Sequence, residues 1–370
     1  MTDNNNLIVY CEYEDGKVAD VSLELLTKGR VLADKLGVKL EALVIGDKLD
    51  KIEETLYPYG VDTVYKVEDA RLYPYTSNPH ASVLINLFKE IKPQICLMGA
   101  TCIGRDLGPR CAARLHTGLC ADCTHLDVDM PIYKDFLRSA STLPEEKIEK
   151  MNTAKVMGQD HDVSRDLKMT RPAFGGNLMA TIICPRFRPA MATVRPGVMK
   201  KAPFDQAKAD AVKITKPSFT LSEADMDTEV VEVVKAAKKL VDLIGADYIV
   251  SVGRGISKDV EGGIKLAEEL ADVLGGVVGG SRVAIDSGWL TADHQVGQTG
   301  KTVHPKVYIA LGISGSIQHK AGMSESECII AVNKNETAPI FEIADYGICG
   351  DLFKVTPMLI EAFKAAKAAK

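Results

Sequence analysis

The chain has little of what marks membrane-spanning or nucleic-acid-binding proteins. Its 370 residues contain no apolar run close to the ~20 residues that a membrane-spanning helix requires. Basic residues are not in excess, because 45 Lys and Arg stand against 50 Asp and Glu and leave a net charge of -5. A surface for nucleic acid or for an anionic membrane is therefore not expected. With 46% hydrophobic and 26% charged residues, the composition is that of a globular protein.

Targeting signals and a disulfide framework are also missing. The first residues, MTDNNNLIVYCEY, have neither the basic and apolar regions of a secretory signal nor the Arg-rich pattern of a transit peptide. An odd number of cysteines, nine, in a large chain without such a signal favours reduced thiols. We therefore expect a cytoplasmic protein.

No spacing of residues indicates a metal site or an acid-base centre. Cys120 and Cys123 have the CxxC spacing of zinc and redox sites, but a second CxxC pair is absent and the common iron-sulfur spacings do not fit. The seven histidines form no ligand pattern, and no nucleophile stands in a pattern with a base. We expect no metal and no catalytic residue, and we expect these cysteines to be small buried residues.

The first half of the chain alternates between short apolar runs and amphipathic stretches. This alternation predicts a parallel sheet flanked by helices, because parallel strands need helical crossovers. The expected strands are residues 7–13, 40–46, 63–67 and 95–100, and the expected helices are residues 20–37, 49–60, 77–92 and one that follows Gly104.

The length predicts two α/β domains. Single hydrophobic cores stop growing near roughly 250–300 residues, so a chain of 370 should divide. We place the domains at residues 1–235 and 236–370, each built on a mainly parallel sheet flanked by helices. Before the boundary, the Lys-rich residues 202–216 are expected to form a loop, and residues 229–234 a strand that returns to the first sheet.

The second domain opens with a pattern that falls short of a dinucleotide fingerprint. An apolar strand at residues 246–252 leads into the tripeptide GRG at residues 253–255 and a helix at residues 259–274. The third glycine of the fingerprint would fall on Lys258, and the next strand ends near Arg282 where an NAD site places an acidic residue. An NAD-dependent dehydrogenase is therefore disfavoured, and it stays open as an alternative.

Two loops further along have the composition of a phosphate site. The apolar run at residues 307–311 passes through GISG, residues 312–315, into a helix start at Ser316. A strand that turns through small residues into a helix presents backbone N–H groups to an anion. Upstream, GQTGK at residues 297–301 adds an amide, a hydroxyl and an ammonium group. Together the loops predict a site for a phosphate-bearing cofactor.

A series of sequence blocks runs through the second domain. The blocks are SRVAIDSGW (281–289), HQVGQTGK (294–301), LGISGSIQHKAGM (311–323), IIAVNKNETAPIFEIADYG (329–347) and DLFKVTPML (351–359). In this order they resemble the FAD domain of the electron transfer flavoprotein alpha subunit. The first domain is more diffusely similar to the same family at GATCIGRDLGPRCAARLHTGLCADCTHLDVD (99–129) and TRPAFGGNLMATIICPRFRPAMATVRPG (170–197). The resemblance therefore covers most of the chain.

The resemblance implies FAD as the cofactor, a Rossmann-like C-terminal domain to bind it, and a set of contact residues. Arg254 would contact the pyrophosphate through paired hydrogen bonds. Ser281 and Arg282 would lie beside the isoalloxazine ring, where a positive charge favours the reduced, anionic flavin and raises its potential. The other implied contacts are Thr299 near N5 with Val296, Gly297 and Gln298, His319 at the C2 carbonyl, Ser314, Gly315, Ser316, Ile317 and Gln318 around the ribityl and phosphate groups, and Asn333, Asp351 and Leu352 at the adenosine.

Some of these residues also have an ordinary structural explanation. Arg282 could pair with Asp286 or Asp293, and His319 could be a hydrogen-bonded surface histidine. Asp351 is a good helix N-cap and needs no ligand to account for it. Without the resemblance, these residues would not by themselves indicate a cofactor site.

The resemblance also implies partners. A beta subunit would complete a heterodimer, and the chain would carry electrons between an NADH-linked flavin of that subunit and an acyl-CoA dehydrogenase or related flavoenzyme. By itself the chain would be an electron carrier. Residues 170–197 resemble alpha subunits of anaerobes and of the nitrogen-fixation-linked branch, some of which bifurcate electrons toward ferredoxin or flavodoxin, so bifurcation is a hypothesis.

A non-redox adenine-nucleotide-binding module is the other open alternative, since phosphate loops alone do not demand a flavin.

Overall fold

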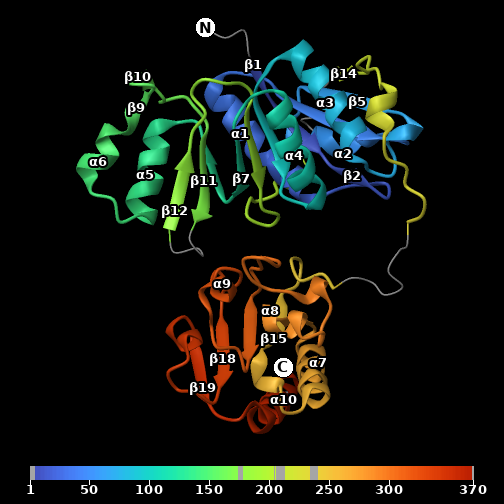
Figure 1. Ribbon diagram of the computed structural model, residues 1–370. Helices are drawn as coiled ribbons and strands as arrows, with labels where there is room; N and C mark the ends of the chain where they lie inside the picture. The colour runs from blue at the N-terminus through green and yellow to red at the C-terminus, as the bar shows by residue number, and fades with distance from the viewer. Residues whose placement is uncertain (1–4, 174–177, 204, 206–212, 234–240, 369–370) are drawn as a thin grey trace. The chain divides into compact units, whose positions relative to one another are not determined.

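The computed structural model describes residues 5–173, 178–203, 205, 213–233 and 241–368. The chain divides into two compact units, formed mostly by the residues up to 233 and by the residues from 241 onward. The boundary that we expect between residues 235 and 236 lies outside the described residues. Each unit is built around its own parallel sheet (Figure 1).

The first unit contains a seven-stranded sheet whose neighbouring strands are all parallel. Its order is β14-β5-β4-β1-β6-β13-β7. The strands are β1 (Asn5–Cys11), β4 (Leu40–Gly46), β5 (Thr63–Glu68), β6 (Pro93–Gly99), β7 (Leu119–Cys123), β13 (Ala190–Val194) and β14 (Lys213–Thr215). The helices are α1 (Asp20–Leu36), α2 (Ile52–Leu56), α3 (Ser77–Ile91), α4 (Cys102–Arg114), α5 (Met130–Ala140) and α6 (Glu145–Glu149).

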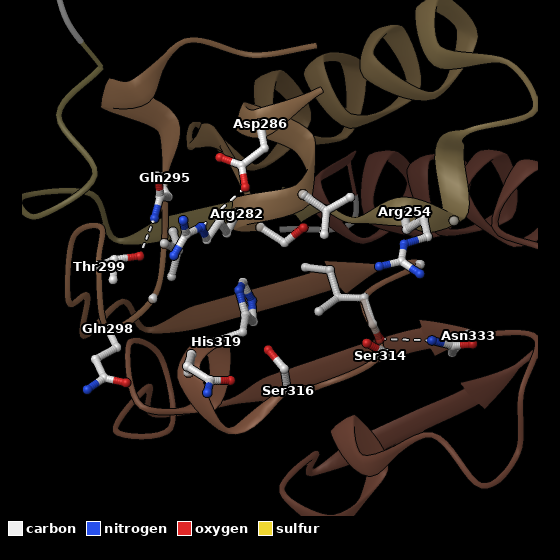
Figure 2. Close-up of a pocket in the computed structure, with 18 of the residues that line it drawn as sticks. Arg254, Arg282, Asp286, Gln295, Gln298, Thr299, Ser314, Ser316, His319 and Asn333 are labelled. Carbon is white, nitrogen blue, oxygen red and sulfur yellow. Dashed lines mark hydrogen bonds and ion pairs between the residues drawn. The ribbon is translucent and has the colours of Figure 1, made fainter. Parts of the chain in front are cut away.

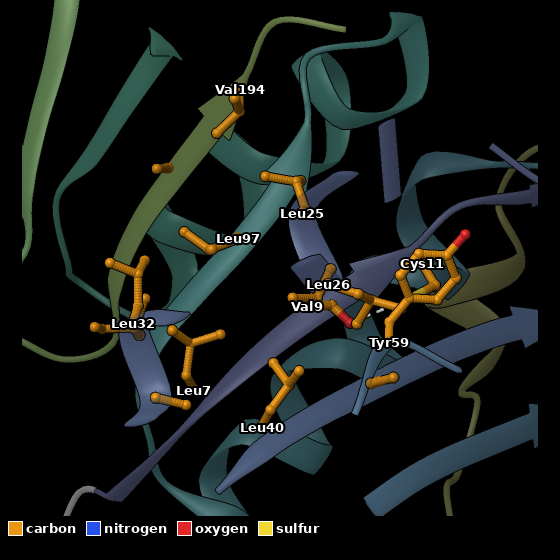
Figure 3. Packing of buried hydrophobic residues seen from close by; sticks show 14 of the residues in the cluster. Leu7, Val9, Cys11, Leu25, Leu26, Leu32, Leu40, Tyr59, Leu97 and Val194 are labelled. Carbon is orange, nitrogen blue, oxygen red and sulfur yellow. Dashed lines mark hydrogen bonds between the residues drawn. The ribbon is translucent and has the colours of Figure 1, made fainter. Parts of the chain in front are cut away.

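Both faces of this sheet are covered, and the sequence of β1 shows why. Leu7 and Val9 point into the cluster that holds the apolar face of α1 (Figure 3). Ile8 and Tyr10 point into the cluster formed with α3 and α4. Successive side chains of a strand face opposite ways, so a strand buried on both faces is apolar throughout. The expected parallel sheet with helices on both faces is confirmed.

Smaller sheets extend the first unit. Each has two or three strands, and the CxxC cysteines lie in the main sheet rather than in these additions. Cys120 and Cys123 on β7 are buried, as expected of small core residues. The smaller strands are β2 (Tyr13–Glu14) with β3 (Lys17–Val18), β9 (Thr153–Val156) with β10 (Gln159–Asp162), and β8 (His125–Asp127) with β11 (Lys168–Ala173) and β12 (Leu178–Ile182).

Three local predictions for the first unit are wrong. The helix expected at 49–60 is only the short α2 followed by a 3-10 turn at Tyr57–Tyr59, because Pro58 lacks the N–H that an α-helix interior requires. The loop expected at 202–216 contains β14, which pairs in parallel with β5. The strand expected at 229–234 is not formed over its described residues 229–233, and Val231 there is 92% exposed. Residues 229–233 have the apolar composition of a buried strand, but their side chains are exposed to solvent. Composition alone therefore led to the wrong prediction.

The second unit contains a five-stranded parallel sheet with the order β16-β15-β17-β18-β19. Numbered from its own first strand, this is the doubly wound order 2-1-3-4-5. The strands are β15 (Tyr248–Val252), β16 (Val277–Gly280), β17 (Val307–Leu311), β18 (Ile329–Asn333) and β19 (Tyr346–Cys349), and the helices are α7 (Val260–Leu274), α8 (Arg282–Asp286), α9 (Ile317–Lys320) and α10 (Leu352–Ala368). The expected Rossmann-like architecture is confirmed.

Strand register in the second unit positions the loops that follow. Val252 pairs with Leu311, so β15 and β17 end level with each other. Successive connections of the sheet leave these two central strands in opposite directions, which is the topological switch point where doubly wound sheets hold ligands. None of the helices in the described residues is long and apolar enough to span a membrane.

Candidate cofactor-binding site

A cavity of about 650 Å³ opens at the carboxyl ends of β15 and β17, at this switch point (Figure 2). Its size is within the range of roughly 300–1,000 Å³ found for small-molecule sites. The walls come from the loops after β15, β16 and β17, from the loop at residues 295–299 and from the start of α9. The lining residues are Arg254, Gly255, Ser257, Ser281, Arg282, Val283, Asp286, Gln295, Val296, Gly297, Gln298, Thr299, Gly312, Ile313, Ser314, Ser316, Gln318, His319 and Asn333.

The two central loops touch each other through glycine backbone. Gly255 N donates to Gly312 O at 3.0 Å, and a Cβ on Gly255 would lie 2.6 Å from Gly312 Cα. Gly312 also has a φ of +64°, which side-chain-bearing residues rarely adopt. This contact leaves the Arg254 side chain exposed at the cavity rim, and within the described part of the chain no carboxylate forms an ion pair with it.

The loop after β17 is fixed from behind, so that its serines face the cavity. Asn333 Nδ2 donates to Ile313 O at 2.8 Å, and Ile340 N donates to Ser314 O at 3.1 Å. A Cβ on Gly315 would lie 2.4 Å from Ile340 N, so this position admits only glycine without a shift. Ser314 and Ser316 are exposed on the cavity side of the loop.

The loop at residues 295–301 closes another side of the cavity. Gln298 N donates to Gln318 O at 2.7 Å, and Gln295 Nε2 donates to Thr299 Oγ1 at 2.8 Å, so the loop is tied both to α9 and to itself. The ammonium group of Lys301, which we expected in the phosphate site, instead donates to Val241 O at 2.7 Å. Lys301 is not among the residues that line the cavity.

Short helix α8 brings a positive charge to the cavity. Ser281 precedes it as its N-cap residue, and Arg282 is its first residue. Arg282 Nε lies 3.2 Å from Asp286 Oδ2, so the pairing with Asp286 rather than Asp293 is formed. Both side chains of this ion pair are about two-thirds exposed, at 67% and 63%, which keeps the interaction weak. Arg282 therefore remains available to an anionic group in the cavity.

His319 is the one buried titratable side chain in the wall. It is 4% exposed, so it is not the surface histidine that its sequence position would allow. Its Nε2 lies 3.0 Å from the hydroxyl of Tyr308, and its Nδ1 is buried without a hydrogen-bond partner. Burial lowers the pKa of His319 to about 4, and the Val296 backbone acts in the opposite direction. The ring is therefore neutral near pH 7.

Four of the expected contact residues do not line the cavity. Gly315 and Ile317 belong to the loop and to α9 but lie outside the wall, and Ile317 is 43% exposed. Asp351 Oδ1 accepts from Phe353 N at 3.1 Å, as a helix N-cap does, and its Oδ2 pairs with Lys334 Nζ at 2.8 Å. Leu352 is buried behind the two glycine loops.

The remaining expected residues are brought together by the fold. They are Arg254, Ser281, Arg282, Val296, Gly297, Gln298, Thr299, Ser314, Ser316, Gln318, His319 and Asn333. The sequence did not single out Ser257, Val283 or Gln295 as contacts, although each is within three residues of one that it did. Within the described part of the chain, no cluster of His, Cys, Asp or Glu is arranged to hold a metal ion.

The cavity suits a large anionic cofactor with a hydrogen-bonding ring. The exposed guanidinium group of Arg254 and the small-residue turns suit a pyrophosphate, and the exposed guanidinium group of Arg282 suits a ring that gains negative charge. The partnerless Nδ1 of His319 is a buried polar atom, and such atoms are rare unless a ligand or water completes them. The residues present therefore fit FAD.

Comparisons with known proteins agree with this geometry. Residues 242–324 match the family of the electron transfer flavoprotein FAD-binding domain, and residues 7–142 and 147–219 match the electron transfer flavoprotein domain. The acryloyl-CoA reductase electron transfer subunit beta of Anaerotignum propionicum is 60% identical over 98% of this chain and 96% of that protein. The electron transfer flavoprotein subunit alpha of Thermoanaerobacterium thermosaccharolyticum is 48% identical over 99% of this chain and 100% of that protein.

A third relative, the protein FixB of Clostridium saccharobutylicum, is 46% identical over 98% of each chain. The family models together cover most of the sequence, and they include the loops that line the cavity. The FAD-binding match bears out the cofactor that the phosphate loops and the resemblance predicted. The chain belongs to the electron transfer flavoprotein alpha-subunit family, and its cofactor is FAD.

Proposed function

We propose that this chain is the alpha subunit of a heterodimeric electron transfer flavoprotein and that it binds FAD in the cavity at the switch point of its second unit. The observation that carries the proposal is the meeting of Arg254, Arg282 and His319 around one cavity, with Nδ1 of His319 buried and without a hydrogen-bond partner. We place residues 236–370 as the FAD-binding domain and residues 1–235 as the domain that contacts the beta subunit.

In this proposal each wall of the cavity holds a different part of FAD. Arg254 and the serines after β17 bind the pyrophosphate and ribityl groups, because their donors are exposed at the turn where the two loops meet. Ser281, Arg282, Thr299 and His319 surround the ring. FAD supplies the redox chemistry when it is bound, and the chain positions it and sets its potential.

Gly315, Asp351 and Leu352 have indirect roles in this proposal, and Ile317 is only the first residue of α9. Gly315 allows the loop after β17 to lie against the backbone of Ile340, and Leu352 packs behind the two glycine loops. Asp351 starts α10 and pairs with Lys334. Of the three residues that we assigned to the adenosine, only Asn333, at the end of β18, lines the cavity.

The partner on the acceptor side is an acyl-CoA dehydrogenase or a related flavoenzyme. The support is the name of the relative from Anaerotignum propionicum, which is an electron transfer subunit of an acryloyl-CoA reductase. We retain electron bifurcation from NADH toward ferredoxin or flavodoxin as a hypothesis about the complex, since a second flavin would belong to the beta subunit. The complex purified with its beta subunit should then reduce ferredoxin with NADH only in the presence of the acyl-CoA acceptor.

The FAD affinity of the proposed site can be tested separately from its effect on the flavin potential. FAD affinity of the heterodimer is measured by the recovery of flavin fluorescence during dilution, for the unchanged chain and for Arg254→Gln. Loss of one charge-assisted contact should weaken binding by roughly 10- to 100-fold, which corresponds to about 1.5–3 kcal/mol. The matched control is Lys364→Gln, whose ammonium pairs on the surface with Glu269 and Glu361. Equal affinities of all three proteins would contradict the assignment of Arg254.

A further inference from the structure

A buried side-chain pair stands behind the wall of the cavity. Tyr308 on β17 is 0% exposed, and its hydroxyl lies 3.0 Å from Nε2 of His319. The two rings are 6.0 Å apart between centroids and tilted by 57°, so they meet edge to edge through this hydrogen bond rather than by stacking. The other ring nitrogen, Nδ1, has no hydrogen-bond partner.

The number of available acceptors decides which atom donates in this pair. Burial raises the pKa of Tyr308, so its hydroxyl keeps its proton and needs an acceptor. Ser251 Oγ, on the neighbouring strand, lowers that pKa but has no hydrogen-bond partner, whereas Nε2 of His319 lies 3.0 Å from the Tyr308 hydroxyl. Nε2 of His319 is then the acceptor for the Tyr308 proton.

A neutral imidazole carries one hydrogen, and the other nitrogen accepts. If Nε2 accepts from Tyr308, the hydrogen of His319 is on Nδ1. We propose that Tyr308 is a positioning residue that fixes this tautomer, so that His319 presents Nδ1–H as a permanent donor to the flavin ring. This inference rests on the proposed function, because it requires the ring of FAD to lie beside His319.

The alternative tautomer, with the hydrogen on Nε2, would be unfavourable at both ring nitrogens of His319. Nδ1 would turn a lone pair toward a ring that becomes negatively charged on reduction, and the Tyr308 proton would lose its acceptor in a buried environment. A donor that is already oriented costs no reorganisation when the negative charge develops. Because the ring is neutral at pH 7, this donor does not depend on protonation of His319.

The direct test is the tautomer of His319 in the heterodimer, measured by ¹⁵N NMR with labelled histidine. The signals of His319 are assigned by their loss in His319→Gln. The expected spectrum has a protonated Nδ1 and an unprotonated Nε2, both with FAD bound and after FAD is removed. A protonated Nε2 in the unchanged protein would overturn the inference, and this measurement needs no variant of Tyr308.

Tyr308→Phe supplies a second readout. Loss of the hydrogen bond should reduce the population ratio of the two tautomers on the order of fivefold, since one such bond contributes about 1 kcal/mol. The midpoint potential of the flavin should fall as well. Tyr346→Phe, on β19 and 65% exposed, is the matched control and should change neither quantity. An unchanged tautomer ratio in Tyr308→Phe would contradict the inference.

Failure of this inference can be told from failure of the proposed site. If FAD binds elsewhere, adding FAD to the FAD-free protein will leave the ring signals of His319 unmoved, whatever its tautomer. If FAD binds in the cavity but Tyr308 has no positioning role, those signals will move and the tautomer will be unaffected by Tyr308→Phe. The inference predicts that FAD moves the signals and that Tyr308→Phe changes the tautomer.

Discussion

Replacing Arg282 with Gln should lower the midpoint potential of the bound flavin. The guanidinium is 67% exposed and paired with Asp286 at 3.2 Å, so its interaction with a reduced ring is screened by water and partly balanced. We take about 1 kcal/mol for it, the value for two unit charges roughly 4 Å apart in bulk water. For one electron, 59 mV corresponds to about 1.4 kcal/mol, which gives a decrease of about 40 mV.

The same ion pair provides a change of opposite sign. Asp286→Asn removes the countercharge and leaves Arg282 unpaired beside the cavity, so the potential should rise by a similar or smaller amount. Both proteins are titrated with a reductant under argon in the presence of a reference dye. Glu361→Gln on α10 is a control that changes the net charge without altering the cavity. A higher potential in Arg282→Gln, or shifts of the potential in the same direction in both variants, would show that this ion pair does not act on the flavin as described.

Three further results are expected. Gly312→Ala should destabilise the second unit by about 1–3 kcal/mol and lose FAD, because a Cβ would lie 2.7 Å from Gly255 Cα, whereas Gly275→Ala has a similar φ of +76° with open space and should keep FAD in a binding assay. The pKa of His319 is about 4 in the folded chain and about 6.5 in the unfolded chain, so the free energy of unfolding should fall by on the order of 3 kcal/mol as the pH drops from 6.5 toward 4. Urea unfolding at several pH values should show this decrease, and the decrease should be smaller in His319→Gln. Leu32→Ala, in the core of the first unit, should lower the free energy of unfolding by about 2–5 kcal/mol without affecting FAD binding by the heterodimer.

The strand and helix pattern of both units was predictable because its residues are buried on the faces that the pattern indicates. Leu7 and Ile8 show this, since they enter clusters on opposite faces of one sheet. The predictions that were wrong concern segments whose burial depends on contacts with residues far away in the sequence. The three residues of β14 have no apolar pattern and become a strand only through pairing with β5, while Val231 lies in an apolar stretch and is exposed.

The site was predictable as a set of loops but not in its details. The small residues at 312–315 indicate a phosphate site from the residues themselves, whereas Arg282 was expected beside the ring only through the family resemblance. Sequence could not show that Lys301 turns away to bond Val241 O, because only the folded loop determines where a long side chain ends. Nor could it show that His319 is buried against Tyr308, eleven positions earlier in the chain, since that contact depends on how α9 packs on β17.

Whether this chain holds FAD is tested by the visible absorption spectrum of the chain, co-purified with its beta subunit and titrated with dithionite under argon. We expect flavin absorption bands that bleach on reduction, and in Arg254→Gln we expect the flavin of the alpha subunit to dissociate at a protein concentration roughly 10- to 100-fold higher than in the unchanged chain. A colourless protein that takes up no added FAD, or one that binds nicotinamide or adenine nucleotide instead, would show that the chain is not an FAD-binding electron carrier.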